Sequence, residues 1–346
     1  MVKVGVVGYG YWGPNLVRNF SDCNDATVVA VSDLDGRRLQ SLQTRYPAIR
    51  TTTDYRDIVR DPQVDVVAVA TPVSTHFNIG MEALRAGKHV WLEKPMTRTA
   101  DEAEQLIDET EKRKLLLHVD HTFVYTGAVR KIHDLLRSGS VGQVYYYDSV
   151  RVNLGLFQHD VNVIWDLAVH DVSILDFLLE SRPVAVSATG MNHIADRPEN
   201  IAFITLFFNS NLIAHLHVNW LSPVKVRKTL IGASEKMVVF DDLEATEKIK
   251  IYDKGITLSN GTTPEQLHKV LVSYRTGDMW CPRIDTTEAL QVASNHFVDC
   301  IQNSTKTITD GLAGLRVVQT LEAASRSLTE RGRPVEIAKA MSWSHS

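Results

Sequence analysis

Apolar runs alternate with amphipathic stretches through the first third of the chain. Runs rich in valine, isoleucine and leucine fall at residues 3–7, 27–32, 64–70, 89–92 and 115–119. Short apolar runs bounded by turn residues predict buried strands. Helical spacing of apolar residues lies between them, at 74–86 and at 100–113, where Thr99 and Glu102 form a potential capping box. This alternation predicts a doubly wound parallel sheet.

The pattern changes after one more predicted helix at residues 128–137. Strand-like runs then follow one another at 144–153, 184–191, 201–208, 212–220, 226–231 and 236–240. Connections between some of them are too short to cross over between parallel strands, so we expect a large, mainly antiparallel open sheet. Further helices are predicted at 164–179, 286–302 and 312–331. The second half is therefore an α+β region.

Composition narrows the class of protein. The chain has 346 residues, 44% of them apolar and 23% charged, as in globular proteins with two domains. A net charge of −4 without a long basic run argues against nucleic-acid binding. No apolar run is long enough for a membrane span, and a strand at the start leaves no room for a signal peptide. Three scattered cysteines fit a reducing cytoplasm.

The first predicted strand ends in the spacing G-x-G-x-x-G. Its glycines are Gly8, Gly10 and Gly13, with Tyr11 and Trp12 between the last two. In a dinucleotide-binding βαβ unit the first glycine allows a tight turn, the second lets the backbone approach the pyrophosphate, and the third lets helix and strand pack closely. The diphosphate would then meet the free N–H groups at the start of the helix.

An acidic residue closes the second predicted strand. Asp33 stands twenty residues after Gly13, where a carboxylate can accept hydrogen bonds from both ribose hydroxyls and repel a 2′-phosphate. Leu34 follows it, and Arg37 and Arg38 are near enough in sequence to reach a phosphate. This pattern favours NAD over NADP. We therefore expect a dinucleotide-binding Rossmann domain over residues 1–122, followed by a second domain over 123–346, for which the family resemblance given below implies substrate binding and oligomerisation.

A Glu-Lys-Pro turn follows the strand predicted at 89–92. Glu93, Lys94 and Pro95 lie at its carboxyl end, on the edge where doubly wound sheets bind ligands. The proline restricts Lys94 to extended conformations, so its ammonium would be held in one direction. A solvated pair of charges on a surface loop is the alternative, but the position beside a cofactor motif favours function.

A third group of residues lies on the helix predicted at 164–179. Asp166 and His170 are four residues apart, so their side chains share one face of an α-helix. Such a pair can orient an imidazole and stabilise its protonated form, which suits general acid/base chemistry. A surface ion pair or a partly buried structural histidine is the alternative.

In this order, the glycine turn, the Glu-Lys-Pro turn and the Asp-x-x-x-His helix resemble the glucose–fructose oxidoreductase, inositol dehydrogenase and rhizopine-catabolism (Gfo/Idh/MocA) family. The resemblance covers essentially the whole chain. It implies pyridine-nucleotide-dependent oxidation or reduction of a sugar or cyclitol hydroxyl, and a homodimer or homotetramer formed through the C-terminal sheet. It also implies Lys94 and His170 as a catalytic pair, with Asp166 beside them. Positions matching those that line the cofactor are Thr71, Pro72, His76, Glu93 and Lys94.

Within the family, shorter stretches resemble enzymes that oxidise position 3 of nucleotide-linked sugars. Candidate substrate-binding residues, from these stretches and from polar positions nearby, are His121, Tyr125, Arg151, Asn153, Asn162, Trp165, His170 and Arg283. His159 and Asp160 lie in a loop that could close over substrate. His215 and His217 alternate along one strand, but no third ligand with metal-site spacing accompanies them, so no metal is expected.

These residues support an NAD-dependent sugar dehydrogenase. His170 would take the hydroxyl proton while Lys94 stabilises the alkoxide, and Lys94 acting as the base is the alternative. A cluster of Lys225, Arg227 and Lys228 could meet the diphosphate of a nucleotide sugar. A free sugar or inositol, or an NAD-dependent glycosidase that oxidises C3 transiently, remain alternatives. A non-catalytic nucleotide sensor is disfavoured because the catalytic motifs are intact.

Overall fold

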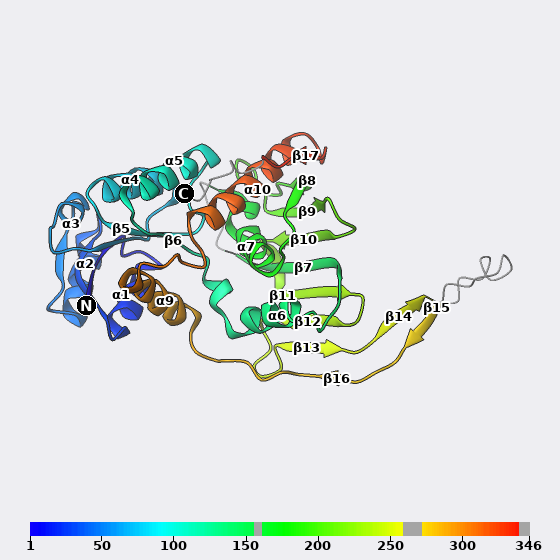
Figure 1. The fold of residues 1–346 in the computed structure, drawn as a ribbon. Coiled ribbons are helices and arrows are strands. Elements are labelled where there is room, and N and C mark those ends of the chain that lie inside the picture. Colours follow the sequence, from blue (N-terminus) through cyan, green and yellow to red (C-terminus); the bar gives the residue numbers. More distant parts are fainter. Residues whose placement is uncertain (156–160, 259–271, 339–346) are drawn as a thin grey trace. The chain divides into compact units, whose positions relative to one another are not determined.

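The computed structural model describes residues 1–155, 161–258 and 272–338 (Figure 1). They form two compact units, and each unit is discontinuous in sequence. The first contains residues 1–126 and 286–322, and the second contains the described residues of 127–285 with 323–338. The boundary that we expect at residue 122 separates a cofactor-binding from a substrate-binding domain and does not describe compact units. It stays a prediction.

A six-stranded parallel sheet forms the centre of the first unit, in the order β3-β2-β1-β4-β5-β6. Its strands are β1 (Val2–Val7), β2 (Ala26–Ser32), β3 (Arg50–Thr52), β4 (Val66–Val69), β5 (His89–Glu93) and β6 (Leu117–Asp120). Nearly all residues of the central strands β1 and β4 are buried, because helices cover both faces of such a sheet. The strand order reverses between β1 and β4, where doubly wound sheets bind ligands. The predicted doubly wound sheet is confirmed.

Helices connect these strands and pack on the sheet. They are α1 (Gly13–Asp22), α2 (Gly36–Arg45), α3 (Arg56–Val59), α4 (His76–Arg85), α5 (Ala100–Arg113) and α9 (Ala289–Asn303), with 3-10 turns η1 (Val73–Thr75) and η2 (Thr122–Tyr125). The predicted cap of α5 is present, since Thr99 Oγ1 accepts a hydrogen bond of 3.2 Å from the Glu102 N–H. The amide of Arg98 donates in return to the Glu102 carboxylate, at 3.1 Å.

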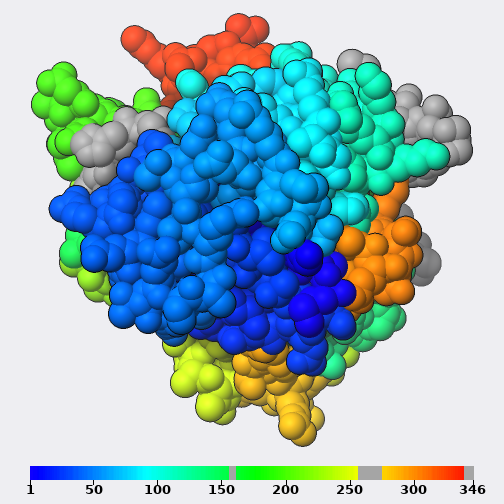
Figure 2. All heavy atoms as spheres, turned by 90° about the vertical axis from the view of Figure 1, so that its left-hand side faces the viewer, coloured from blue at the N-terminus to red at the C-terminus, as the bar shows by residue number. Residues whose placement is uncertain are grey.

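An aromatic cluster explains why α9 belongs to the first unit. Trp91 of β5 is fully buried, and its ring centroid lies 5.2 Å from that of Phe20 on α1 and 5.6 Å from that of Phe297 on α9. An ion pair of 2.6 Å between Arg18 and Glu288 joins α1 to the residue before α9. In Figure 2, orange atoms of this late segment lie beside the dark blue N-terminal residues.

The second unit contains a nine-stranded sheet in the order β16-β13-β12-β11-β7-β10-β9-β8-β17. Its strands are β7 (Val144–Leu154), β8 (Pro183–Met191), β9 (Ile201–Phe208), β10 (Ile213–Asn219), β11 (Leu221–Ala233), β12 (Met237–Asp241), β13 (Ile249–Tyr252), β16 (Met279–Trp280) and β17 (Val335–Glu336). Neighbouring strands are antiparallel except β7 and β10, which pair in parallel. The connection from β7 to β10 includes a helix and two strands, so it is long enough for this crossover. The expected mainly antiparallel sheet is confirmed.

Helices α6 (Gly127–Arg137) and α7 (Val169–Leu178) belong to the second unit, and α10 (Gly311–Thr329) begins in the first and ends in the second. A separate hairpin pairs β14 (Gly255–Leu258) with β15 (Val272–Arg275). The α-helix predicted from residue 164 differs in its first turn, because Ile164–Ala168 (η3) is a π-helix. None of the helices in the described parts of the chain is long and apolar enough to span a bilayer.

Candidate functional site

The glycine turn between β1 and α1 is as compact as its sequence predicts. Gly8 has φ of +97°, and a Cβ there would lie 2.6 Å from the Ala70 carbonyl oxygen. A Cβ on Gly13 would collide with the Gly8 carbonyl oxygen, whereas one on Gly10 would meet only the Arg38 guanidinium, at 3.5 Å. No side chain caps the N-terminus of α1. The turn therefore leaves open space and helix N–H groups where a diphosphate can bind.

Asp33 holds this turn from the end of β2. Its carboxylate is 8% exposed and accepts hydrogen bonds from the Tyr9 N–H, at 2.7 Å, and the Asp35 N–H, at 2.8 Å. Arg38 Nη1 lies 3.4 Å from the same carboxylate. The predicted cofactor residue thus also orders the glycine turn, and its negative charge stays at the edge where the adenosine ribose is expected.

The other residues predicted to bind the cofactor at this edge have solvent-exposed side chains. The side chains of Leu34 and Tyr11 are 92% and 87% exposed, so both are available to cover a ligand. The Arg37 guanidinium is 91% exposed and pairs with Asp35 at 3.2 Å. Arg38 is therefore the cation that pairs with Asp33, whereas Arg37 pairs with Asp35, which caps α2.

Replacing Asp33 with alanine should reduce the preference for NADH over NADPH by at least about tenfold, because two charge-assisted hydrogen bonds to the ribose are lost. Cofactor fluorescence gives both dissociation constants without a substrate. Asp35→Ala is the matched control, since Asp35 caps α2 through the Arg37 N–H, at 2.9 Å. A wild-type protein that prefers NADPH, or an unchanged ratio in Asp33→Ala, contradicts the ribose assignment.

Lys94 lies in a turn that a buried histidine attaches to the neighbouring strand. The Lys94 N–H donates to the Glu93 carboxylate at 2.6 Å, and the peptide before Pro95 is cis. The ring nitrogens of His76 lie 2.9 Å from the Thr71 carbonyl and 3.0 Å from the Pro95 carbonyl. Burial lowers the pKa of His76, so its neutral ring donates to one carbonyl at a time. His76 therefore positions the turn from inside the protein.

The remaining predicted residues of the β4 edge form a small polar turn. The hydroxyls of Thr71 and Thr75 are 2.7 Å apart, and the Pro72 carbonyl accepts from the Thr75 hydroxyl at 2.8 Å. These contacts order the start of α4 next to the Lys94 turn. The predicted residues Thr71, Pro72, His76, Glu93 and Lys94 are thus brought together at the carboxyl ends of β4 and β5.

Sequence reasoning missed Asp120, a fully buried carboxylate at the end of β6. It accepts hydrogen bonds from the Trp12 indole, at 3.0 Å, and from the Thr122 hydroxyl, at 2.7 Å. Burial raises the pKa of Asp120 to about 6, although these two donors and the charge of Lys94 act in the opposite direction. The available signal was its position, since Asp120 follows a predicted strand just as Glu93 does.

His121 and Tyr125 come after Asp120 but have different surroundings. His121 is 1% exposed, and neither ring nitrogen has a hydrogen-bond partner among the described residues. Burial, reinforced by the charge of Lys94, lowers the pKa of His121 to about 3, so the ring is neutral. Tyr125 instead packs in the core, with its hydroxyl 3.1 Å from that of Thr309. These surroundings favour contact with a bound substrate or cofactor for His121 and a packing role in the core for Tyr125.

Indole and amide groups anchor the segment that carries Asp166. Asn162 Oδ1 accepts from the Ile164 and Trp165 N–H groups, at 3.2 and 3.3 Å. The Trp165 indole donates to the Ser325 hydroxyl of α10, at 2.8 Å. The Asp166 carboxylate accepts from the indole of Trp220, at 3.0 Å. Asn162 and Trp165, predicted to bind substrate, therefore also hold the π-helical turn in place.

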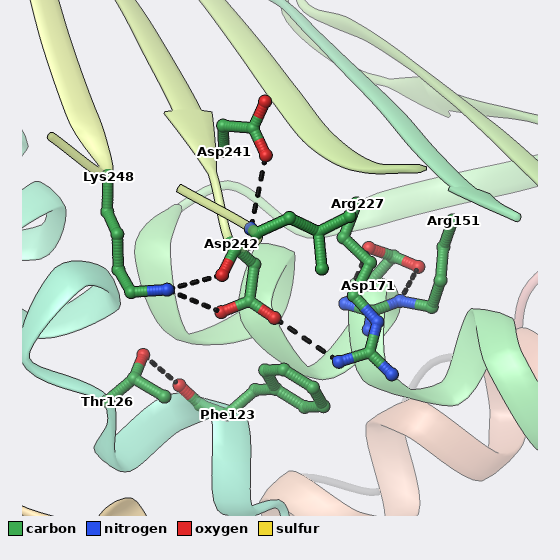
Figure 3. A network of polar contacts seen from close by, with 9 residues as sticks. Phe123, Thr126, Arg151, Asp171, Arg227, Asp241, Asp242 and Lys248 are labelled. Atoms are coloured by element: carbon green, nitrogen blue, oxygen red, sulfur yellow. Dashed lines mark hydrogen bonds and ion pairs between the residues drawn. The ribbon is translucent and has the colours of Figure 1, made fainter. Parts of the chain in front are cut away.

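A buried ion pair fixes the next turn of this helix to the sheet (Figure 3). Asp171 is 2% exposed and accepts from Arg151 of β7 at 2.8 and 3.2 Å, and from the Ser149 hydroxyl at 2.7 Å. His170 precedes Asp171 and is half-buried. Arg151, predicted to bind substrate, is 4% exposed in this pair. Its geometry fits the positioning of α7, and a substrate contact stays a prediction.

Two further candidates for substrate contact differ in exposure. Asn153 of β7 is half-buried, and Arg283, after β16, is exposed. Arg283 belongs to no helix or strand and lies in the segment that leads from β16 to α9. His159 and Asp160, expected in a closing loop, lie outside the described residues.

The cation cluster expected to meet a diphosphate is largely neutralised. Arg227 lies 3.3 Å from Asp242 (Figure 3), and Lys228 lies 3.2 Å from Asp241, while Lys225 is exposed. Strand β12 ends at Asp241 and Asp242 follows it, so the pairing of β12 with β11 brings both acids to the cations. The cluster therefore gives little support to a phosphate site.

Two histidines share the exposed side of β10. His215 lies 3.6 Å from Asp148, and the ring of His217 stacks on that of Phe203 with centroids 4.4 Å apart. Within the described ranges no three histidine, cysteine, aspartate or glutamate side chains form a group that could hold a metal ion.

Family comparison assigns both halves of the chain. Residues 2–121 match the model of an oxidoreductase family with an NAD-binding Rossmann fold, and residues 129–238 match the GFO/IDH/MocA C-terminal domain. The chain belongs to the GFO/IDH/MocA family. It is thus an oxidoreductase whose N-terminal sheet is an NAD-binding Rossmann domain, as the glycine turn and Asp33 predict.

Family members with assigned activities resemble the chain over most of its length. UDP-N-acetylglucosamine 3-dehydrogenase of Acidithiobacillus ferrooxidans is 28% identical, over 92% of this chain and 94% of that protein. Its crystal structure superimposes with a TM-score of 0.80, covering 95% of this chain and 98% of that one at 24% identity, which shows a shared fold. The NADP-dependent scyllo-inositol 2-dehydrogenase of Bacillus subtilis is 24% identical, over 95% of this chain and 94% of the relative.

Proposed function

We propose that this protein oxidises the 3-hydroxyl of a nucleotide-linked sugar, with NAD as the hydride acceptor. The observation that carries this proposal is the likeness to UDP-N-acetylglucosamine 3-dehydrogenase over 92% of the chain. The intact Lys94 turn and the Asp166–His170 segment support the same chemistry. The cations of β11 do not contribute to the argument, because two of the three are paired with acids.

Oxidation of a sugar hydroxyl needs one group that accepts the hydroxyl proton and another that stabilises negative charge on the oxygen. NAD, when bound, supplies the nicotinamide that accepts the hydride. His170 takes the hydroxyl proton, since an imidazole exchanges protons near neutral pH. The Lys94 ammonium stabilises the oxygen as its charge grows, and Asp166 supports the imidazole. In the alternative assignment Lys94 is the base.

A substrate panel tests the proposal. UDP- and dTDP-linked sugars are offered beside the matching free sugars and inositols, and NADH formation is recorded at 340 nm, the absorption of the reduced cofactor. We expect turnover with nucleotide sugars and little with free ones. Turnover of free polyols, with every nucleotide sugar inert, would reject the nucleotide-sugar substrate and leave the family intact.

Two alternatives have their own outcomes in this panel. Oxidation of inositols would match the activity of the second relative, a scyllo-inositol 2-dehydrogenase. A glycosidase that oxidises C3 only transiently would release the aglycone from glycosides without net NADH.

We further propose a homo-oligomer assembled through the nine-stranded sheet, in the cytoplasm. Phe203 of β9 and Ile213 of β10 support the assembly, because these large apolar side chains are 41% and 46% exposed. Three cysteines without a disulfide support a reducing compartment. Analytical ultracentrifugation checks the assembly, and a monomer at micromolar concentration contradicts it.

A further inference from the structure

The first unit divides a bound dinucleotide between two halves of its sheet. The glycine turn after β1 would take the diphosphate, and Asp33 at the end of β2 would take the adenosine ribose. The nicotinamide half of a dinucleotide bound in this way would extend in the other direction, toward the carboxyl ends of β4, β5 and β6. Lys94 and Asp120 lie at this second edge.

Asp120 is built rigidly into that edge. Register pairing places it opposite Glu93, directly before Lys94. Both carboxylate oxygens are occupied, one by the Trp12 indole of the glycine turn and one by the Thr122 hydroxyl, at 3.0 and 2.7 Å. The side chain is fully buried, so its charge is weakly screened by water. Above its pKa, a buried carboxylate of this kind is a negative charge held in one position.

The side chains next to Asp120 decide how much of its charge is offset. Among the described residues, Glu93 and Lys94 lie at the end of β5, His121 follows β6, and Tyr125 lies in η2. His121 is neutral, because its pKa is lowered to about 3, and the pKa of Tyr125 is raised by burial, so the phenol is neutral as well. Neither ring therefore carries a positive charge that would offset the Asp120 carboxylate.

We propose that Asp120 sets the relative affinity of this enzyme for NAD⁺ and NADH. The oxidised nicotinamide ring is a cation and the reduced ring is neutral, so a fixed negative charge at this edge stabilises the oxidised form alone. The inference rests on the proposed function only in taking NAD as the cofactor. A preference for NAD⁺ favours loading of the oxidised cofactor and release of NADH after each turnover, while it lowers the reduction potential of the bound cofactor.

The affinity for NAD⁺ should depend on pH through the charge of Asp120. The pKa of Asp120 is raised to about 6, so the carboxylate is charged above this pH and neutral below it. NAD⁺ favours the charged form, so its affinity should rise as the pH increases through 6 and then level off. NADH has no ring charge to interact with, so its affinity should change little.

Binding measurements on the full chain test this without any substrate. Dissociation constants for NAD⁺ and NADH are measured by calorimetry between pH 5 and 8, in the wild type, Asp120→Asn and Thr122→Val. Asparagine keeps the shape and the hydrogen bond from Trp12 but removes the charge. Thr122→Val is the matched control, since it removes one donor to the same carboxylate and leaves the charge at pH 8.

We expect the ratio of the NADH constant to the NAD⁺ constant to fall by roughly tenfold in Asp120→Asn at pH 8. A tenfold change equals about 30 mV in the potential of the bound cofactor. The wild-type ratio should fall similarly below pH 6, and Thr122→Val should resemble the wild type at pH 8. The wild-type pH series needs no variant, so it decides the matter even if Asp120→Asn is unstable.

Other results overturn the inference. Equal weakening of both cofactor forms in Asp120→Asn would make Asp120 only an anchor for Trp12, and a wild-type ratio constant from pH 5 to 8 would remove the charge effect. Absence of binding of either form would reject the NAD assignment itself. Failure of the sugar panel would leave these binding ratios unaffected, so the two proposals can fail separately.

Discussion

Replacing His170 with asparagine should lower kcat by about 10²–10⁴-fold, because asparagine can donate a hydrogen bond but cannot accept the substrate proton. NAD binding should be unchanged, since the cofactor-binding sheet belongs to the first unit and His170 to the second. The variant should also melt near the wild-type temperature, because the substitution leaves the buried contacts of Asp171 with Arg151 and Ser149 in place. Steady-state rates at saturating concentrations of a substrate identified by the panel give kcat, and single-turnover rates give the chemical step alone.

Matched variants separate chemistry from folding. Lys94→Ala should also lose turnover, because the ammonium that stabilises the alkoxide in the proposed mechanism is removed. His215→Asn removes a histidine that is 47% exposed on β10, and it should keep full activity. Near-normal turnover in His170→Asn would transfer the base role to Lys94 or to water. Loss of folding in both His170→Asn and Lys94→Ala would make the two residues structural.

Local patterns were sufficient to predict the fold class. Strand β1 is apolar at nearly every position and ends in a glycine turn, so both its burial and its place in a parallel sheet follow from its own sequence. The parallel pairing of β7 with β10 does not, because it depends on which strands meet after a long connection. The return of α9 to the first unit is equally non-local, since it depends on Phe297 meeting Trp91.

The candidate site likewise contains residues that local sequence motifs predict and residues whose importance depends on distant contacts. Gly8, Asp33 and Lys94 stand at strand ends in motifs whose chemistry can be recognised from spacing alone. Asp120 and Asp171 belong to no motif, and their importance comes from burial and from partners such as Trp12 and Arg151, which are distant in sequence. A sequence pattern can identify a charged residue, but only the fold shows whether water or a buried partner surrounds it.

Removing one partner of the buried pair should be the most damaging change to stability. Arg151→Met would leave the Asp171 carboxylate, 2% exposed, without its guanidinium. An uncompensated buried charge of this kind costs about 3–5 kcal/mol of unfolding free energy. Chemical denaturation of the variant measures that loss. The double variant with Asp171→Leu should recover part of it, because both charges are then gone.

Lys228→Met is the matched control, since its ion pair with Asp241 is partly exposed and should be worth no more than about 1 kcal/mol. A different outcome for Arg151→Met would support substrate binding by Arg151, the role predicted from the sequence. If Arg151→Met keeps wild-type stability and only KM rises, Arg151 contacts the substrate. If stability falls as expected, kcat of the remaining folded enzyme should fall by a larger factor than KM changes. The reason is that Asp171 follows His170, and the Arg151–Asp171 pair fixes this turn of α7 to β7.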